Sequence, residues 1–407
     1  MTVVVRGGFV IDRPADVVIA GERIVDIMAP GTAETVGAEV IDAGGLAVLP
    51  GMVDGHVHFD EPGRSDWEGF DAGSAAAAAG GVTTIVDMPI DSDPPTTTAA
   101  LAEAKVDAAR ARSRVDVALW GGLVPGSVDH LDDLAAAGVV GFKAFACPSG
   151  WDDFPAVDEP TLVAGFAAAH RHGLPLALHA ELEALGHTAE SEVAAIGWAA
   201  SRADGARLHV VHVSAAAAVD EARRWPNVTV ETCPHYLSLT TTADPHARCT
   251  PPIRDAANQE ALWRHVLDGA VDAIASDHSP CPPERRGEWA GVAGVETTLA
   301  VLLSSGRMTL AQVAHLTTAA ARLLRLPGKG AIVRDYDADI ALVDLDAAWT
   351  VSPDALWCRH RSSPFIGRQL GARVVRTLVR GSTVFDLADG PRPHQGRVLR
   401  ARSAGRP

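Results

Sequence analysis

Two histidines one residue apart, His56 and His58, stand in the stretch DGHVHFDEPGRSDWEGF (residues 54–70), directly after an apolar run. Residues two apart on a β-strand share one face, so both imidazoles point to the same side. Imidazoles are common ligands of Zn²⁺ and related ions, and this pair could supply two of them. A hydrogen-bonded pair of core histidines has the same spacing, so other residues must decide between these interpretations.

Polar side chains also end four other apolar, β-like runs. They are Lys143 in GFKAF, His179 in LHAE, His212 in HVVHVS and Asp277 in ASDHSP. An unpaired charge in a dry protein interior is very unfavourable, so these polar strand ends together indicate a site. Imidazoles combined with carboxylate oxygens are the donors that a divalent ion such as Zn²⁺ takes.

Lys143 requires a separate explanation, because an ammonium group cannot bind a cation and its burial beside two metal ions is strongly unfavourable. A neutral amine instead reacts with CO2 to form a carbamate, an anion whose two oxygens could bridge two metals. A lysine that pairs with a carboxylate or reaches solvent is the alternative. Among so many histidines, we predict that Lys143 is carboxylated.

Three other histidines lie close to the predicted ligands in the sequence. His209 and His212 differ by an odd number, so only one faces inward, and His212 lies nearer the carboxyl end of its run. His235 follows the end of its strand, and we expect it in the pocket or behind the ligands. His278 adjoins Asp277 and should therefore point elsewhere.

The elements that must position these residues alternate between β-rich runs and Ala-rich helical stretches from residue 51 to about 326. The β-rich runs are MVDGHVHF, VTTIVDMP, VDVALWGGLV, VVGFKAF, LPLALHA, ARLHVVHVS, VTVETCPHYL and VDAIASDHSP. Alternating strands and helices form βα units with parallel pairing. Eight units predict an α/β protein with a (β/α)8 TIM barrel, whose active site lies at the carboxyl ends of its strands.

Short β-rich runs separated by turns also make up the first fifty residues, and similar runs return near the end of the chain. We therefore expect residues 1–50 and 328–390 to form a small β-sandwich-like domain contributed by both termini. Residues 51–327 form the barrel in this interpretation. Residues 391–407 are rich in Pro and Arg, which predicts a flexible tail.

The overall composition argues against several classes of partner. A formal net charge of −16 over 407 residues disfavours nucleic acid and anionic membranes. No run approaches the roughly 20 apolar residues of a membrane-spanning helix, and the start MTVVVRGGFV does not resemble a signal peptide. Five scattered cysteines suggest no disulfide framework. We expect a reduced, cytoplasmic protein.

Several longer motifs together resemble the cyclic amidohydrolases, and within them the allantoinases. They are PGMVDGHVHFDEPGRSDWEGF, AAAAGGVTTIVDMP, ALWGGLVPG, GFKAFACPSG, SDHSPCPPE, GVAGVETTL and RHRSSPFIGRQL. The resemblance extends from about residue 40 to 385. It implies two divalent ions, one held by His56 and His58 and the other by His179 and His212. Carboxylated Lys143 would bridge the ions, and Asp277 would contact the first.

The resemblance also implies an activity. A cyclic amide, in this family allantoin, is hydrolysed to allantoate in purine and ureide catabolism. Two cations make a hydroxide available from water at pH 7, and Asp277 carries the proton from it to the leaving ring nitrogen. Zn²⁺ is the expected metal, with Mn²⁺, Co²⁺ or Fe²⁺ as alternatives. Homotetramers are common in the family, so we expect a homo-oligomer.

The substrate is less well defined by the motifs. Asp60 stands where dihydroorotases carry an arginine for the substrate carboxylate, which disfavours such a ring. Asp60, Glu61 and Arg64 are candidate contacts to the ureido arm of allantoin, and a salt-bridged structural loop is the alternative for these three. Thr250 and Gly294 are further candidate substrate-binding residues. The segment 179–212 is shorter than the family leads us to expect. The motifs therefore do not define the substrate range or the subunit contacts of this protein.

Two alternative functions follow from these departures. A hydantoinase- or dihydropyrimidinase-type cyclic amidohydrolase shares the metal ligands but differs in the residues that meet the ring substituent. A non-catalytic scaffold of the same fold is the third hypothesis, which the full set of predicted ligands in this chain disfavours.

Overall fold

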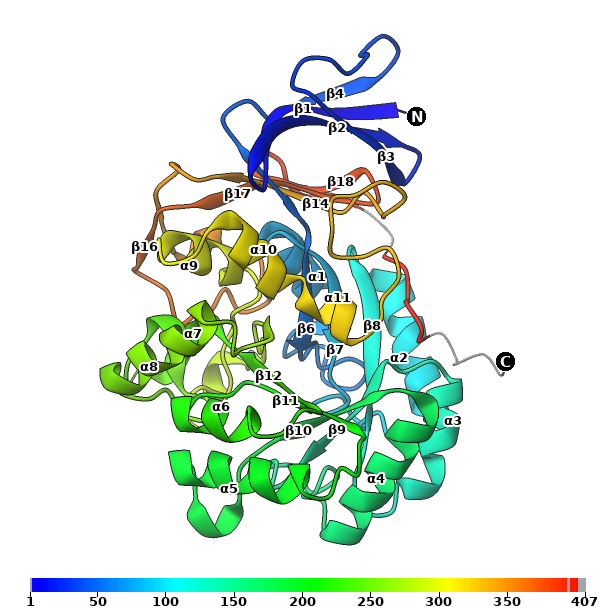
Figure 1. Cartoon of the computed structure of the whole chain (residues 1–407), viewed down its shortest axis with the longest axis vertical. Coiled ribbons are helices and arrows are strands. Elements are labelled where there is room, and N and C mark those ends of the chain that lie inside the picture. Colours follow the sequence, from blue (N-terminus) through cyan, green and yellow to red (C-terminus); the bar gives the residue numbers. More distant parts are fainter. Residues whose placement is uncertain (1, 243, 394–395, 402–407) are drawn as a thin grey trace.

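The centre of the molecule is a barrel of eight parallel strands, seen in a computed structural model that describes residues 2–242, 244–393 and 396–401 (Figure 1). The strands are β6 (Met52–Val57), β7 (Val82–Asp87), β8 (Asp116–Gly122), β9 (Gly141–Phe145), β10 (Pro175–His179), β11 (Arg207–Val210), β12 (Val228–Thr232) and β13 (Ala273–Ile274). The barrel closes where the backbone N–H of His58 donates to the carbonyl of His278 at 2.7 Å. The predicted fold class is confirmed.

Helices surround the barrel and return the chain from each strand to the next. They are α1 (Gly69–Ala79), α2 (Ala99–Arg112), α3 (Leu131–Ala136), α4 (Glu159–His172), α5 (Ala189–Ala200), α6 (Ala216–Ala222), α7 (Pro234–Ser238), α8 (Ala256–Leu267), α9 (Thr298–Ser304), α10 (Leu310–Thr317) and α11 (Ala319–Leu323). Side chains of Thr98, Asp158 and Thr188 accept backbone N–H bonds at the starts of α2, α4 and α5. Such caps satisfy the free donors of the first turn. No helix of the described residues is long and apolar enough to cross a membrane.

Both ends of the chain build a second, nine-stranded sheet above the barrel (Figure 1). Its strands are β1 (Thr2–Val10), β2 (Arg13–Ala20), β3 (Arg23–Met28), β4 (Glu39–Asp42), β5 (Ala47–Pro50), β14 (Ile340–Asp344), β17 (Arg373–Val379), β18 (Ser382–Asp386) and β19 (Gly390–Pro391). Antiparallel pairing of β5 with β14 joins the N-terminal and C-terminal strands. A separate two-stranded ribbon consists of β15 (Trp349–Thr350) and β16 (Gln369–Leu370).

Part of the segment predicted as a flexible tail lies along the barrel. Residues 396–401 lie alongside β8. Val117 N–H donates to the Arg397 carbonyl at 2.8 Å, and Leu399 N–H donates to the Val117 carbonyl at 2.7 Å. The same prediction also covers residues 394–395 and 402–407, which lie outside the described residues. The proposed domain boundaries stay a prediction.

A buried ion cluster connects the barrel to the second sheet. The Nζ of Lys329 lies 2.5 Å from Asp116 at the start of β8, 2.9 Å from Asp337 and 2.7 Å from Asp339. Arg380 of the sheet also pairs with Asp116. Burial opposes the charge of Lys329, but the three carboxylates outweigh it and raise the pKa of the amine. The cluster fixes the first residue of β8, Asp116, to residues more than 200 positions later in the chain.

Replacing Lys329 with methionine should therefore lower the free energy of unfolding by about 3–5 kcal/mol, because three buried carboxylates lose their shared cation. Urea denaturation of the wild type and the variant measures the change. Arg392→Met is the control, because it breaks only the exposed pair with Asp389 and should cost less than about 1 kcal/mol. Equal midpoints for Lys329→Met and wild type would contradict this account.

Candidate active site

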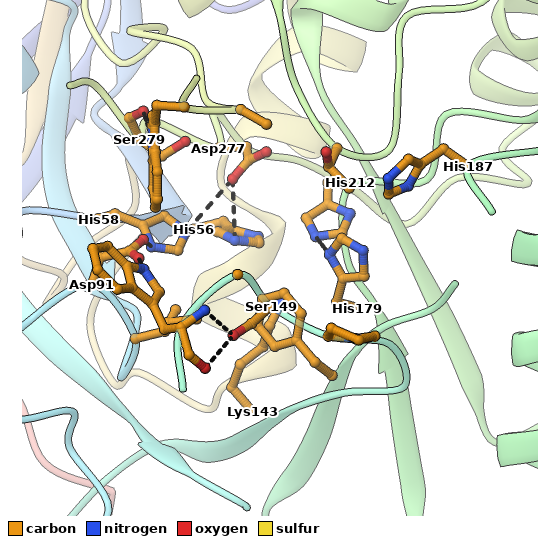
Figure 2. A pocket seen from close by; sticks show the side chains of 18 of the residues that line it. His56, His58, Asp91, Lys143, Ser149, His179, His187, His212, Asp277 and Ser279 are labelled. Carbon is orange, nitrogen blue, oxygen red and sulfur yellow. Dashed lines mark hydrogen bonds and ion pairs between the residues drawn. The ribbon is translucent and has the colours of Figure 1, made fainter. Parts of the chain in front are cut away.

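One cavity of about 360 Å³ opens at the carboxyl ends of the barrel strands (Figure 2). All six residues predicted as metal ligands line it: His56, His58, Lys143, His179, His212 and Asp277. They come from β6, β9 and β10 and from the residues that follow β6, β11 and β13, so the closed barrel brings together positions up to 221 residues apart. Convergence of polar side chains in an otherwise apolar barrel is typical of a catalytic site.

His56, His58 and Asp277 form the first group of donors. The Nε2 atoms of His56 and His58 lie 3.3 and 3.7 Å from the same Asp277 oxygen, Oδ1. Burial works against a charge on Asp277, but His56 and His58 outweigh it and hold the pKa of this carboxyl well below its usual range. Three donor atoms within 4.8 Å of one another fit a single divalent ion.

His179 and His212 form the second group, on the opposite side of the cavity (Figure 2). The Nδ1 of His179 lies 3.1 Å from the Nε2 of His212, so the two rings direct one nitrogen each toward a common point. Burial lowers the pKa of both imidazoles, which favours their neutral form. Neutral imidazoles are the form that binds metal.

The amine of Lys143 lies between these groups, fully buried, and it has no hydrogen-bond partner among the described residues. The chain contains only three lysines, and the other two are also buried. Lys105 and Lys329 each have a carboxylate oxygen at 2.5 Å. Burial lowers the pKa of Lys143 to about 8, so a neutral amine is accessible near pH 7. This amine therefore fits conversion to an anion by CO2, whereas the other two fit ordinary ion pairs.

Glu231 on β12 hydrogen-bonds to His56 on the side of the ring away from Asp277. Its Oε1 lies 3.0 Å from Nδ1 of His56, and its Oε2 lies 3.5 Å from Nε2 of His209. Burial opposes its charge, but the hydrogen bonds with both histidines lower the pKa of Glu231 to about 2. An ionised carboxylate at this position keeps the proton of His56 on Nδ1, which leaves Nε2 free to bind a metal.

Two other buried carboxylates contact two more of the predicted ligands, one by an ion pair and one by a hydrogen bond. The Oδ2 of Asp91 lies 2.6 Å from Nδ1 of His58, and Glu181 accepts from Nε2 of His179 at 2.8 Å. These outer carboxylates and Glu231 were not among the sequence predictions. Each follows or ends a β-rich run, which is the only signal that could have indicated them.

A model described as the Amidohydrolase family matches residues 47–384, which is most of the chain and includes every residue of this cavity. The chain belongs to the amidohydrolase family. The resemblance predicted from its motifs is thus confirmed, and the protein is a hydrolase that acts on cyclic amides.

The chain is similar over nearly its full length to proteins named allantoinase. The relative from Rubrobacter xylanophilus is 43% identical, with 98% of this chain and 97% of the relative covered. The relative from Solibacter usitatus is 40% identical over 448 positions, with the same coverage of both chains. Because 448 exceeds the 407 residues present, that relative has residues that this chain lacks.

Solved structures of similar fold are named hydantoinase or dihydropyrimidinase. An L-hydantoinase (dihydropyrimidinase) from Arthrobacter aurescens matches with a TM-score of 0.88 and 31% identity, covering 99% of this chain and 98% of that one. A dihydropyrimidinase from Brevibacillus agri matches with a TM-score of 0.88 and 28% identity over the whole of both chains.

Three histidines that neighbour the predicted ligands in the sequence, His209, His235 and His278, lie outside the lining of the cavity. His209 faces Thr229, with 2.9 Å between Nδ1 and Oγ1. His235 is buried against Tyr236, and a ring nitrogen lies within 4.8 Å of an oxygen of Asp277. His278 packs edge-on against Phe59. None of these three is among the residues that line the cavity.

The structure separates the candidate substrate-binding residues. Thr250 lines the cavity, whereas Asp60, Arg64 and Gly294 are not among its lining residues. Asp60 is buried, and burial raises its pKa well above the usual value. A Cβ at Gly294 would lie 3.0 Å from the carbonyl oxygen of Ser276, so this glycine permits close backbone packing beside Asp277.

Glu61 and Arg64 of the charged loop between β6 and α1 bond to other protein groups and do not line the cavity. Glu61 accepts from the backbone N–H of Phe70 at 2.9 Å and pairs with Arg112. The guanidinium of Arg64 stacks on Trp151 at 3.8 Å and donates to the carbonyl of Asp91 at 2.9 Å. This arrangement matches the salt-bridged structural alternative.

The cavity wall includes residues that the sequence analysis missed, among them His187, Trp151 and Trp289. They lie on three different loops at the carboxyl end of the barrel, and no local motif marks them. His187 belongs to the short segment before α5, where its Nδ1 lies 3.1 Å from Glu181. The shortened segment thus still contributes to the pocket.

Replacing Glu231 with glutamine should weaken metal binding about 10- to 100-fold, because His56 loses the ionised partner that fixes its tautomer. Equilibrium dialysis against buffered zinc, followed by elemental analysis, measures the affinity. Glu192→Gln is the matched control: Glu192 is also buried but bonds to Ser214 and Arg254. An unchanged zinc affinity for Glu231→Gln would show that the carboxylate does not orient His56.

Proposed function

We propose that this amidohydrolase hydrolyses allantoin to allantoate at a binuclear metal site. The observation that carries the proposal is the single cavity lined by four histidines, Asp277 and Lys143, whose amine has no hydrogen-bond partner in the described part of the chain. Relatives named allantoinase at 37–43% identity support allantoin as the substrate. The hydantoinase and dihydropyrimidinase structures share 24–31% identity, which favours those activities less.

In this proposal His56, His58 and Asp277 would hold one ion, His179 and His212 would hold the other, and carboxylated Lys143 would supply an anion to both. The donor set of imidazole nitrogens and carboxylate oxygens suits Zn²⁺ best among common ions, while Mn²⁺, Co²⁺ and Fe²⁺ are also compatible. Two such ions, when bound, lower the pKa of a water molecule and polarise a carbonyl group.

Asp277 is the proposed proton carrier. Its carboxylate is ionised at neutral pH and lines the cavity, so it can accept a proton from the attacking water. The same group then returns the proton to the ring nitrogen as the amide bond breaks, as one carboxylate serves first as base and then as acid. Opening the ring yields the carboxylate and the free amide nitrogen without any redox step.

The walls of the cavity suit a small, neutral, polar ring. A volume of about 360 Å³ is near the lower end for small-molecule pockets. Thr250, Ser149 and Ser279 offer hydroxyl groups, while Trp151 and Trp289 offer apolar faces. Hydroxyl groups beside aromatic faces suit the several N–H and carbonyl groups of a cyclic ureide.

The proposal extends to assembly and location. We propose a homotetramer in the cytoplasm, on the basis of the family resemblance and of the cysteine content. Light scattering coupled to size exclusion tests the assembly, with a mass of one chain as the contradicting result.

Turnover of allantoin, hydantoin and dihydrouracil should be compared on one preparation with counted metal. We expect kcat/KM for allantoin to exceed the other two by about tenfold or more, because a site built for the ureido arm leaves polar groups unpaired with simpler rings. A preference for hydantoin or dihydrouracil would favour the alternative activity. Absence of bound metal in protein made with ample zinc or manganese would favour the scaffold hypothesis, whereas two bound ions without turnover of any of the three rings would indicate another substrate.

Lys143→Ala should lose bound metal and at least about 99% of activity, because no anion then joins the two groups of histidines. A short carboxylic acid such as propionate should restore part of both, since it fits the space of the missing carbamate. Lys105→Met is the matched control, a second buried lysine that pairs with Asp87 away from the cavity lining. Full activity of Lys143→Ala without added acid would refute the bridging role.

A further inference from the structure

Three tryptophans from three loops pack against one another at the cavity. Trp67 follows β6, Trp151 follows β9 and Trp289 follows β13. Their ring centroids are separated by 6.0 Å for Trp67 and Trp151, 5.0 Å for Trp67 and Trp289, and 5.5 Å for Trp151 and Trp289. We call these residues the tryptophan cluster. Because Trp151 and Trp289 line the cavity, the cluster forms part of its wall.

The indole of Trp151 shares a carboxylate with a predicted metal ligand. Its Nε1–H donates to Oδ1 of Asp91 at 2.5 Å, and the other oxygen, Oδ2, lies 2.6 Å from Nδ1 of His58. Asp91 is buried, so water does not compete well for either oxygen. Figure 2 shows Asp91 beside His58 at the edge of the cavity. One carboxylate therefore joins the cavity wall to the imidazole of His58.

Arg64 of the charged loop fixes both ends of this contact. Its guanidinium stacks on the Trp151 ring at 3.8 Å and donates to the backbone carbonyl of Asp91 at 2.9 Å. Asp91 has a φ of 75°, a left-handed conformation that is unfavourable for a residue with a side chain. Such a backbone persists where its surroundings hold it, and Arg64 and Trp151 supply two of the contacts that do so.

We infer that Trp151 is a positioning residue of the metal site. Its indole N–H fixes the rotation of the Asp91 carboxylate, whose ion pair with Nδ1 of His58 in turn holds that ring and favours a proton on Nδ1. With the proton of His58 on Nδ1, Nε2 is free on the side of Asp277, 3.7 Å from its Oδ1. The inference rests on the proposed metal site, and it assigns to the charged loop the task of holding this chain of contacts.

The variant Trp151→Phe removes the N–H group and retains an aromatic ring. Zinc-loaded protein is mixed with a chromophoric chelator, and the release of each ion is followed with time. We expect one ion to leave about 10- to 100-fold faster than in the wild type, while the other leaves at an unchanged rate. Trp225→Phe is the matched control, because Trp225 also donates to a carboxylate, Glu221, at 3.0 Å, on an outer helix.

A double-mutant cycle tests the path through Asp91. If the indole acts through this carboxylate, Trp151→Phe should not accelerate release further in an Asp91→Asn background. Fully additive effects would overturn the inference, and so would wild-type release rates in Trp151→Phe. Should Trp151→Phe fail to fold, Asp91→Asn alone must release one ion faster.

The same experiment separates this inference from the proposed function. Wild-type protein that binds no zinc would overturn both the metal site and the role of Trp151. Wild-type protein that binds two ions and releases both at the same rates as Trp151→Phe would overturn only the role of Trp151.

Discussion

The amine of Lys143, which has no hydrogen-bond partner among the described residues, is the constraint on which the rest of the site depends. A buried ammonium without a hydrogen-bonded counter-ion is unfavourable, and neither the four imidazoles nor Asp277 around the same cavity supplies one. Lys105 and Lys329 show how this protein otherwise buries a lysine, with a carboxylate at 2.5 Å. Conversion of Lys143 to an anion, together with two cations, is the proposed resolution, and it requires donors from five barrel strands to meet.

The orientation of the histidine ligands at such a site depends on the groups that contact their second ring nitrogen. Three of the four histidines direct their second nitrogen to a buried carboxylate, namely His56 to Glu231, His58 to Asp91 and His179 to Glu181. These acids come from strands or loops next to the ligands, so the barrel itself sets their positions. Asp91 extends this pattern to the cavity wall through Trp151. Metal affinity and pocket shape are therefore coupled in the structure.

The sequence was sufficient to predict the barrel and the six candidate metal ligands that meet in its cavity, because strand period and strand ends follow directly from local patterns. Lys143 and Asp277 stood out as charges that end apolar runs. Asp91 and Glu181 did not, since an acidic residue just beyond a strand is common on any protein surface. The role of Arg64 was also out of reach, because its partners Trp151 and Asp91 are 87 and 27 residues away and meet it only in the folded loops.

The central claim is that Lys143 carries a carbamate between two metal ions. ¹³C NMR of metal-loaded protein prepared with ¹³C-bicarbonate tests it most directly. We expect a carbamate resonance in the wild type, retained in Lys105→Met and absent in Lys143→Ala. A wild-type protein that binds two ions and shows no such resonance would contradict it.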